Sequence, residues 1–510
     1  MRSKSVIKIL KLSFLCLFQF TSFGPILAQT GSKREVRAVW IATVKNIDWP
    51  SSSDLSVDLQ KHEATRLLEL LRNAGVNTVF LQVRSSSDAI YAHSREPWAE
   101  WLTGTQGKSP SPFYDPLQFF IDEAHQRGME LQAWINPYRA IFDNIQSSIS
   151  GSQISKVHPD WVFKYAGKTL LNPGIPAVRE YIETVVLDLV SDYNIDGIHL
   201  DDYFYPYPQK GAFIPDKITF ETYRGNFSNI EDWRRNNINL LIKEIGQKIK
   251  ILKPYIKFGI SPFGIWRNKS QDSTGSETSG GSSYQTQYAD TRAWLQNGWV
   301  DYLVPQIYFT AENNRVPFKV LVDWWNRNRF SRQIFIGLGA YRIGEKKDGW
   351  SNPSQIPSQI RYSRLSGTIA GNALFSAHAF LINELGIVDS LKKGLYKNLA
   401  IPPTMPWISN SFPDSPTEVK IKKTDLGNEI TWNAPKANSA LDSTLYFLVY
   451  RFKKEEIQNL EDPKSLLSVV NGKTVYLDPI PSSNSGNNYV YLVSACNRIW
   501  NEGKPSIAIL

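Results

Sequence analysis

The feature that most constrains this fold is a repeated alternation of apolar, β-rich runs with segments of helical periodicity over residues 34–400. Near-continuous apolar strands joined by helical crossovers are typical of a parallel sheet covered on both faces. Eight strand–helix units in about 360 residues predict an α/β fold of the (β/α)₈ TIM-barrel type. The expected strands are Val36–Thr43, Thr78–Arg84, Glu130–Tyr138, Gly197–Tyr203, Lys257–Gly264, Asp301–Phe309, Ile334–Arg342 and Asn372–Leu381. The expected helices are Glu63–Asn73, Leu117–Gln126, Val178–Asp192, Trp233–Leu252, Thr291–Gln296, Phe318–Asn328 and Leu385–Lys393.

A doubly wound open sheet is the alternative, but no glycine-rich dinucleotide turn follows the first strand, since residues 42–46 contain no glycine. The connections that follow strands are long, over 85–115, 140–175, 204–232 and 268–288, whereas those that precede strands are short. In a barrel the loops that follow strands form the C-terminal face, where active sites are built. The insertions therefore predict a functional site on that face. The Ser/Gly/Thr-rich stretch 270–283 fits either a solvated insertion or a lid.

A Pro-rich linker over residues 401–411 separates this region from a second domain over 412–510. Five short strand-like segments, with room for two more, predict a small all-β sandwich. The five are Glu418–Lys422, Asn428–Asn433, Thr444–Phe452, Thr474–Leu477 and Asn488–Cys496. Trp432 and the alternation of inward residues along the last segment resemble a fibronectin type III module.

The N-terminus reads as a secretory signal peptide over residues 1–28. Arg2, Lys4, Lys8 and Lys11 precede a short apolar run, and Ala28 is a small residue at the expected cleavage point. We therefore expect export to the periplasm or to the outside of a bacterial cell. No later segment is long and apolar enough to predict a transmembrane helix.

Composition excludes several classes of function. Part of the net charge of +9 lies in the signal peptide, and no Lys/Arg-rich run follows, so we expect no nucleic-acid partner. The six histidines show no metal-ligand spacing, and no phosphate-binding loop or serine-nucleophile elbow occurs, so we expect no metal and no cofactor. Aromatic residues make up 13% of the chain, with 16 Trp, which suits a protein that stacks rings on flat ligands. The oligomeric state is not indicated.

The strongest local signal is the run from Ile195 to Pro206, an apolar strand that ends in Asp201 and Asp202 and then in aromatic residues. Strand interiors avoid aspartate, so a pair at the C-terminal tip of the fourth barrel strand points to function. Because side chains alternate along a strand, Asp201 is expected to project into the cleft while Asp202 points to the other face. The structural alternative is that the pair caps the following loop.

Glycosidases usually need a second carboxyl group, and the tips of the fifth and sixth strands lack one. The candidates are Asp88 after the second strand, Asp48 after the first and Glu312 after the sixth, with Asp88 ranked first because the second strand ends only a few residues before it.

Other strand tips carry aromatic, amide and guanidinium groups, which suit sugar rings and hydroxyls. Several of these side chains could equally belong to the barrel core. The predicted substrate-binding residues are Trp40, Trp134, Asn136, Tyr138, Arg139, His199, Tyr203, Trp266, Arg267, Gln306, Tyr308 and His378.

Several long motifs resemble the glycosyl-hydrolase-like family ten, a family of exported bacterial proteins on a (β/α)₈ barrel. The motifs are Arg37–Ala42, Pro97–Gly104, Asp115–Leu117, Ala133–Arg139, Asp196–Pro206, Ser261–Asn268 and Asp301–Tyr308. The resemblance covers about residues 34–400 and implies an enzyme that hydrolyses O-glycosyl bonds. Relatives in that family often carry a β module behind the barrel.

Two departures from the family pattern flank the expected cleft: Gln132 stands where relatives have His, and Ser85–Asp88 replaces a Pro/Gly-rich turn. The strand-four motif is more distantly similar to chitinase-like barrels, but His199 and Tyr203 stand in place of an Asp and the catalytic Glu. The mechanism of those barrels therefore does not transfer.

Together these features predict an exported glycoside hydrolase that acts on a poly- or oligosaccharide, such as peptidoglycan or another extracellular glycan. Asp201 is expected to be essential and Asp202 to support it. A non-catalytic carbohydrate-binding or scaffold protein on a degenerate barrel is the alternative. The sequence does not indicate which glycan is bound.

Overall fold

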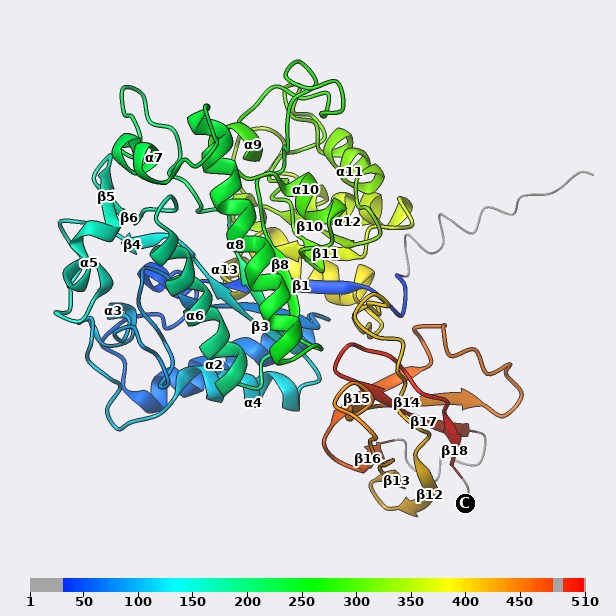
Figure 1. Ribbon diagram of the computed structural model, residues 1–510. Helices are drawn as coiled ribbons and strands as arrows, with labels where there is room; N and C mark the ends of the chain where they lie inside the picture. The colour runs from blue at the N-terminus through cyan, green and yellow to red at the C-terminus, as the bar shows by residue number, and fades with distance from the viewer. Residues whose placement is uncertain (1–30, 480–488, 509–510) are drawn as a thin grey trace, which may run out of the picture.

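A computed structural model describes residues 31–479 and 489–508 (Figure 1). The predicted signal peptide lies outside the described residues. Within them, no helix is both long enough and apolar enough to cross a membrane.

Eight parallel strands close into a barrel in the order β1-β11-β10-β9-β8-β7-β3-β2, which confirms the predicted TIM-type architecture. These strands are β1 (Val36–Ile41), β2 (Thr78–Arg84), β3 (Glu130–Ile135), β7 (Gly197–Leu200), β8 (Lys257–Ile260), β9 (Tyr302–Leu303), β10 (Gln333–Leu338) and β11 (Gly371–Leu374). Every residue in these strands is buried, because the barrel interior and the surrounding helices cover both faces.

The helices that surround the barrel follow their strands in sequence (Figure 1). The longer ones are α2 (Val57–Asn73), α4 (Pro116–Gln126), α6 (Pro176–Asp192), α8 (Ile230–Leu252), α11 (Phe318–Arg327) and α12 (Gln355–Leu365), and the predicted helix α10 (Thr291–Gln296) is a short one. Short helical segments are η1 (Val44–Asn46), α3 (Glu100–Thr103), α5 (Ile154–Val157), η2 (Pro159–Trp161), α7 (Lys217–Tyr223), α9 (Ser283–Thr286), η3 (Ala340–Arg342), α13 (His378–Ile382), η4 (Glu384–Gly386), α14 (Ile387–Ser390) and η5 (Leu391–Leu395). Sequence analysis did not predict α12, whose first turn holds Pro357, a residue tolerated there because its missing N–H needs no partner.

The strand tips differ from the predicted ones. Six of the eight strands end several residues before the predicted boundary, as at Leu200 instead of Tyr203. Sequence analysis also missed a small antiparallel sheet in the loop after β3, formed by β4 (Arg139–Ile141), β6 (Lys168–Leu171) and β5 (Val162–Tyr165). Phe163, Tyr165 and Leu170 of this sheet pack against Ala212 and Ile214 of the loop after β7.

Two small antiparallel sheets follow the barrel (Figure 1). One has the order β12-β13-β16 and the other β15-β14-β17-β18. All five predicted segments are strands, and β15 and β18 fill the room left for two more. The fibronectin type III resemblance stays a prediction. The bounds are β12 (Thr417–Thr424), β13 (Gly427–Asn433), β14 (Thr444–Lys453), β15 (Leu466–Asn471), β16 (Val475–Asp478), β17 (Tyr489–Asn497) and β18 (Ser506–Ile507).

These sheets contact the end of the barrel where strands begin. The indole Nε1 of Trp500 donates to the carboxylate of Glu130, the first residue of β3, at 2.5 Å. Lys257, the first residue of β8, pairs with the same carboxylate. Lys33 forms a further ion pair with Glu502 at 2.7 Å. The C-terminal module therefore covers the end of the barrel opposite the long loops, and leaves the other end open.

Candidate active site

Asp201 and Asp202 lie in the loop that leaves β7, where they line a cavity of about 270 Å³ at the C-terminal mouth of the barrel. Aromatic rings form much of the wall. Among the residues that line this cavity, Asp201 and Asp202 are the only carboxylates. The side chains that surround them are Trp40, Trp134, Arg139, Phe142, Tyr203, Tyr207, Gln306, Tyr308, Tyr341 and Phe375.

Asp201 is held by donors from β3 and the residue after it. Its Oδ2 accepts hydrogen bonds from Trp134 Nε1 at 3.0 Å and from Asn136 Nδ2 at 3.1 Å. Its Oδ1 accepts one from the backbone N–H of Tyr203 at 3.3 Å. The carboxyl group is therefore fixed in place while one side of it faces the cavity.

Asp202 also faces the cavity, which corrects the prediction that it points the other way. Strand β7 ends at Leu200, so the alternation of a strand no longer governs the two aspartates. The Oδ1 of Asp202 accepts from Gln306 Nε2 at 3.1 Å, and its Oδ2 accepts from the hydroxyl of Tyr207. The two carboxyl groups thus lean toward different walls of one cavity.

The environment favours the protonated form of both groups. Burial raises the pKa of Asp201 to about 7, with a further increase from the charge of Asp202 and an opposing effect from Arg139. Burial also raises the pKa of Asp202, although hydrogen bonds from Tyr207 and Gln306 partly oppose it. Two like charges side by side in a dry cavity tend to share one proton, as in an acid–base pair.

The structure does not bring the other candidate carboxylates to this cavity. The Oδ1 of Asp88 accepts from the backbone N–H groups of Ser85 and Ser86, at 2.9 and 2.8 Å, so Asp88 ties its own loop. Asp48 accepts from the N–H groups of Ala42 and His378, which joins the loops after β1 and β11. Glu312 is exposed and lies outside the lining of the cavity.

His199 lies one layer deeper in the barrel and does not line the cavity. The hydroxyl of Tyr302 donates its hydrogen to Gln132. The oxygen of that hydroxyl therefore accepts a hydrogen bond from the Nδ1–H of His199, at 3.0 Å. The free Nε2 then accepts from Ser261 Oγ at 3.0 Å and from Trp40 Nε1 at 3.2 Å. Burial lowers the pKa of His199 to about 3, so the ring is neutral and serves to hold the floor of the cavity.

The predicted substrate-binding residues divide into two groups. Trp40, Trp134, Arg139, Tyr203, Gln306 and Tyr308 line the cavity, and Asn136 supports it through Asp201. The others lie elsewhere.

The structure corrects four predictions in that second group. Tyr138 is fully buried in the hydrophobic core. Trp266 stacks on Trp324 and donates to Asp290, and Arg267 pairs with Asp272. His378 is exposed at the start of α13, so it does not meet His199.

Sequence analysis missed several residues of the cavity. Tyr207 donates to Asp202 and stacks on Tyr203, with ring centroids 5.0 Å apart. Its position in the Tyr-Pro-Tyr-Pro run at 205–208, two residues beyond the aspartates, was the available signal. Phe142, Tyr341 and Phe375 come from three different loops, and no local pattern marks them.

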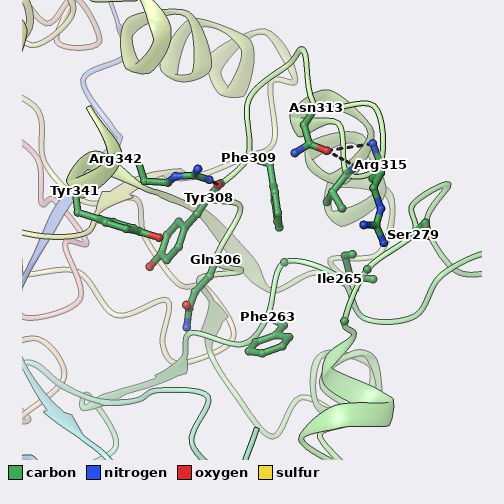
Figure 2. Close-up of a pocket in the computed structure, with 14 residues that line it drawn as sticks. Phe263, Ile265, Ser279, Gln306, Tyr308, Phe309, Asn313, Arg315, Tyr341 and Arg342 are labelled. Atoms are coloured by element: carbon green, nitrogen blue, oxygen red, sulfur yellow. Dashed lines mark hydrogen bonds between the residues drawn. The ribbon is translucent and has the colours of Figure 1, made fainter. Parts of the chain in front are cut away.

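Two further cavities adjoin the central one and share walls with it. The larger, of about 470 Å³, shares Gln306, Tyr308 and Tyr341 (Figure 2). Figure 2 shows Phe263 and Phe309 between Gln306 on one side and Arg315 on the other. Residues 279–281 of the Ser/Gly-rich stretch also line it, so that stretch is part of the wall of this cavity. The smaller cavity, of about 60 Å³, shares Arg139, Tyr203 and Tyr207. Each of these two cavities therefore meets the central cavity, which holds the aspartates, through a different set of side chains.

Comparison with known proteins agrees with the motifs. The sequence model of the family described as Glycosyl hydrolase-like 10 matches residues 35–352. The chain is 40% identical over 509 residues to "Glycosyl hydrolase YngK" of Bacillus subtilis, covering 99% of this chain and 98% of the relative. It is 38% identical over 372 residues to "Glycosyl hydrolase DigH" of Escherichia coli K12, covering 68% of this chain and 83% of the relative.

Among solved structures, the chain is similar to the glycoside hydrolase domain of PgaB (BpsB) from Bordetella bronchiseptica. The TM-score is 0.48 at 14% identity, over 70% of this chain and 98% of that domain. On the strength of the family match and of the relatives that span it, the chain belongs to the Glycosyl hydrolase-like 10 family.

Proposed function

We propose that the protein is an exported glycoside hydrolase that cleaves glycosidic bonds in a polysaccharide of the cell wall or of the extracellular space. The observation that carries this proposal is the buried pair Asp201–Asp202 at the mouth of the barrel, in an aromatic cavity that meets two further cavities. A carboxyl group with a pKa near 7 is the acid that such a reaction requires at neutral pH.

In the proposed mechanism, Asp201 is the general acid. It donates its proton to the glycosidic oxygen as the bond to the anomeric carbon breaks, so the leaving sugar departs as a neutral alcohol. The ionised partner is Asp202, whose two oxygens each accept a hydrogen bond from Tyr207 or Gln306. It replaces Asp88 as the candidate second carboxylate.

Asp202 then either attacks the anomeric carbon or takes a proton from the attacking water. Carboxyl groups about 5–5.5 Å apart favour the first course and retention, and a separation of about 6.5–9.5 Å favours the second and inversion. In both courses the overall reaction consumes one water for each bond cleaved.

The aromatic walls account for sugar binding. Trp40, Trp134 and Tyr308 offer ring faces to the apolar faces of sugars, while Gln306 and Arg139 offer donors to the hydroxyls. Two cavities that adjoin the central one suit a chain that passes through the site, so we propose a polymer and not a short terminal unit as the substrate.

The test is a screen of the purified protein against peptidoglycan, plant and algal polysaccharides, and bacterial exopolysaccharides, with released reducing ends as the readout. Wild type should release reducing ends from at least one class, and Asp201→Asn should not. Asp290→Asn is the matched control, because Asp290 is an aspartate of a loop beside the barrel mouth that does not line any of the three cavities. Equal activity of wild type and Asp201→Asn would refute the proposal.

A carbohydrate-binding protein on the same barrel is the second candidate. One observation favours it: the two carboxylates are neighbours in the chain, and no acid from another strand tip lines the central cavity. This alternative predicts glycan binding with no release of reducing ends and no loss of affinity in Asp201→Asn.

Export is part of the proposal and has its own test. N-terminal sequencing of the protein recovered from its native host should give a mature protein that begins after Ala28. A mature protein that still carries Met1 would contradict export through this segment.

A further inference from the structure

The small cavity beside the aspartates has an unusual charge. It is lined by Arg139 and Lys168 together with Tyr203, Tyr207 and Gln209, and no acidic residue lines it. Its volume, about 60 Å³, is too small for a sugar ring but suits a single substituent of a ring. A pocket with two cations and no acid is electrostatically complementary to an anion.

Arg139 supplies the first cation. Only 8% of the residue is exposed, and its guanidinium lies over the rings of Tyr203 and Phe142, at 4.3 and 5.3 Å from their centroids. Within residues 31–479 and 489–508, no acidic side chain forms an ion pair with it. The backbone is fixed, because its N–H donates to the Oδ1 of Asn136 and β4 pairs with β6. A buried, positioned guanidinium without an ion-pair partner is costly unless a ligand supplies one.

Lys168, the first residue of β6, supplies the second cation. Lys168 is an exposed residue at the edge of this cavity, and partial burial of its ammonium, together with the nearby charge of Arg139, lowers its pKa. It too has no acidic partner in the described part of the chain. An anion bound between the two groups would remove their mutual repulsion.

Arg139 taken alone has a simpler role, which is to favour the ionised form of the aspartates. Its charge lowers the pKa values of Asp201 and Asp202. Lys168 separates the two explanations, because it lines the small cavity and not the central cavity that holds the aspartates. A second cation placed away from the aspartates has no role in holding them ionised. It has a role if an anion enters the small cavity.

We propose that Arg139 and Lys168 form a subsite for a carboxylate carried by a sugar unit next to the bond that is cleaved. The proposal rests on the proposed function, and it assigns the substrate to the acidic glycans. The planar fork of a guanidinium matches the two oxygens of a carboxylate, and the ammonium adds a point charge. The shared residues Arg139, Tyr203 and Tyr207 place this carboxylate within one sugar unit of the aspartates.

The test compares two probes that differ only at C6, methyl β-D-glucuronide and methyl β-D-glucoside, titrated into the full-length protein and followed by NMR. Wild type should bind the glucuronide about tenfold more tightly, and added salt should reduce this preference. Lys168→Met should remove most of the preference. Lys164→Met is the matched control, since Lys164 lies on the adjacent strand β5 but outside the cavity, and it should leave the preference intact.

Equal affinity for the two probes in wild type would overturn the proposal, as would a preference that survives in Lys168→Met. Failure of this subsite is distinguishable from failure of the proposed function. A protein that prefers the glucuronide but hydrolyses nothing retains the subsite and loses the enzymatic role. A protein that hydrolyses neutral glycans without preferring the glucuronide retains the enzymatic role and lacks the subsite.

Discussion

Carboxyl groups are equally buried at the two ends of the barrel, but the residues beside them carry opposite charges. Glu35, just before β1, and Asp201, just after β7, are each 4% exposed. Glu35 accepts from Arg37 at 2.9 Å and from Arg364 at 2.7 Å. Asp201 has neutral hydrogen-bond donors, and among the charges around it that of Asp202 has the largest effect on its pKa.

The consequence is a pair of opposite pKa shifts. Burial alone would raise the pKa of Glu35, but Arg37 and Arg364 lower it below its ordinary value. Burial and Asp202 together raise the pKa of Asp201 to about 7. The comparison teaches that burial does not distinguish a structural carboxylate from a reactive one. The distinction lies in the charge of the neighbours and in whether a cavity faces the group.

The largest expected effect is the loss of activity in Asp201→Asn. Removal of a general acid should lower kcat by about 10²–10⁴-fold on the glycan found by the screen. The melting temperature should stay the same or rise, because the substitution removes a like charge beside Asp202. Initial rates and thermal unfolding measured on one preparation check both statements. A drop in both together would instead indicate a structural role.

At the opposite end, Glu35→Gln should act on stability. It removes the carboxylate that pairs with both Arg37 and Arg364, which costs about 3–5 kcal/mol of unfolding free energy. The activity of the protein that remains folded should match wild type. Denaturant unfolding and specific activity measure the two effects. A stable variant would show that the ion pairs at this end are dispensable.

The two ends should also respond oppositely to pH. The stability that Glu35 contributes is present above its unfolded pKa and lost as pH falls, because its folded pKa is lowered. Asp201 has a raised folded pKa, so its favourable contribution is present below pH 4 and lost as pH rises toward about 7. As pH rises from 4 to 7, Asp201→Asn should therefore become more stable relative to wild type, by a few kcal/mol at most. Unfolding curves at pH 4 and pH 7 measure this gain, and an equal difference at both would contradict it.

The smallest effect concerns the module that covers the closed end. Trp500→Phe keeps a ring to stack on Tyr446 but removes the N–H that reaches Glu130, and it should cost about 1.5 kcal/mol. Trp432→Phe is the control in the same module, since its indole N–H has no described partner. Equal costs for the two variants would mean that the bond to Glu130 adds nothing.

Sequence analysis predicted the barrel because each strand–helix unit carries its own periodicity, and it predicted Asp201 because an aspartate at a strand tip breaks that periodicity. It placed the strand ends too late, since the aromatic residues after Leu200 continue the strand composition. It ranked Asp88 as the second carboxylate and placed Asp202 on the wrong face, because the direction of Asp202 depends on Tyr207 and on Gln306 from a distant strand tip.

The errors share a physical cause. Tyr138, Trp266 and Arg267 are residue types that often bind sugars. In the structure Tyr138 packs in the core, and Trp266 and Arg267 bond to Asp290 and Asp272 of their own loop. Asp88 was predicted to be a catalytic carboxylate. It instead accepts hydrogen bonds from the backbone N–H groups of Ser85 and Ser86, in a turn of its own loop. Which acceptor a loop side chain meets depends on the fold of that loop, which residue composition does not specify.

The dependence of kcat/KM on pH tests the central claim most directly, since a general acid must be protonated to act. On a glycan that wild type hydrolyses, kcat/KM should fall above about pH 7, by tenfold for each further pH unit. A kcat/KM that stays constant or rises from pH 6 to pH 9 would contradict the assignment of Asp201 as the acid.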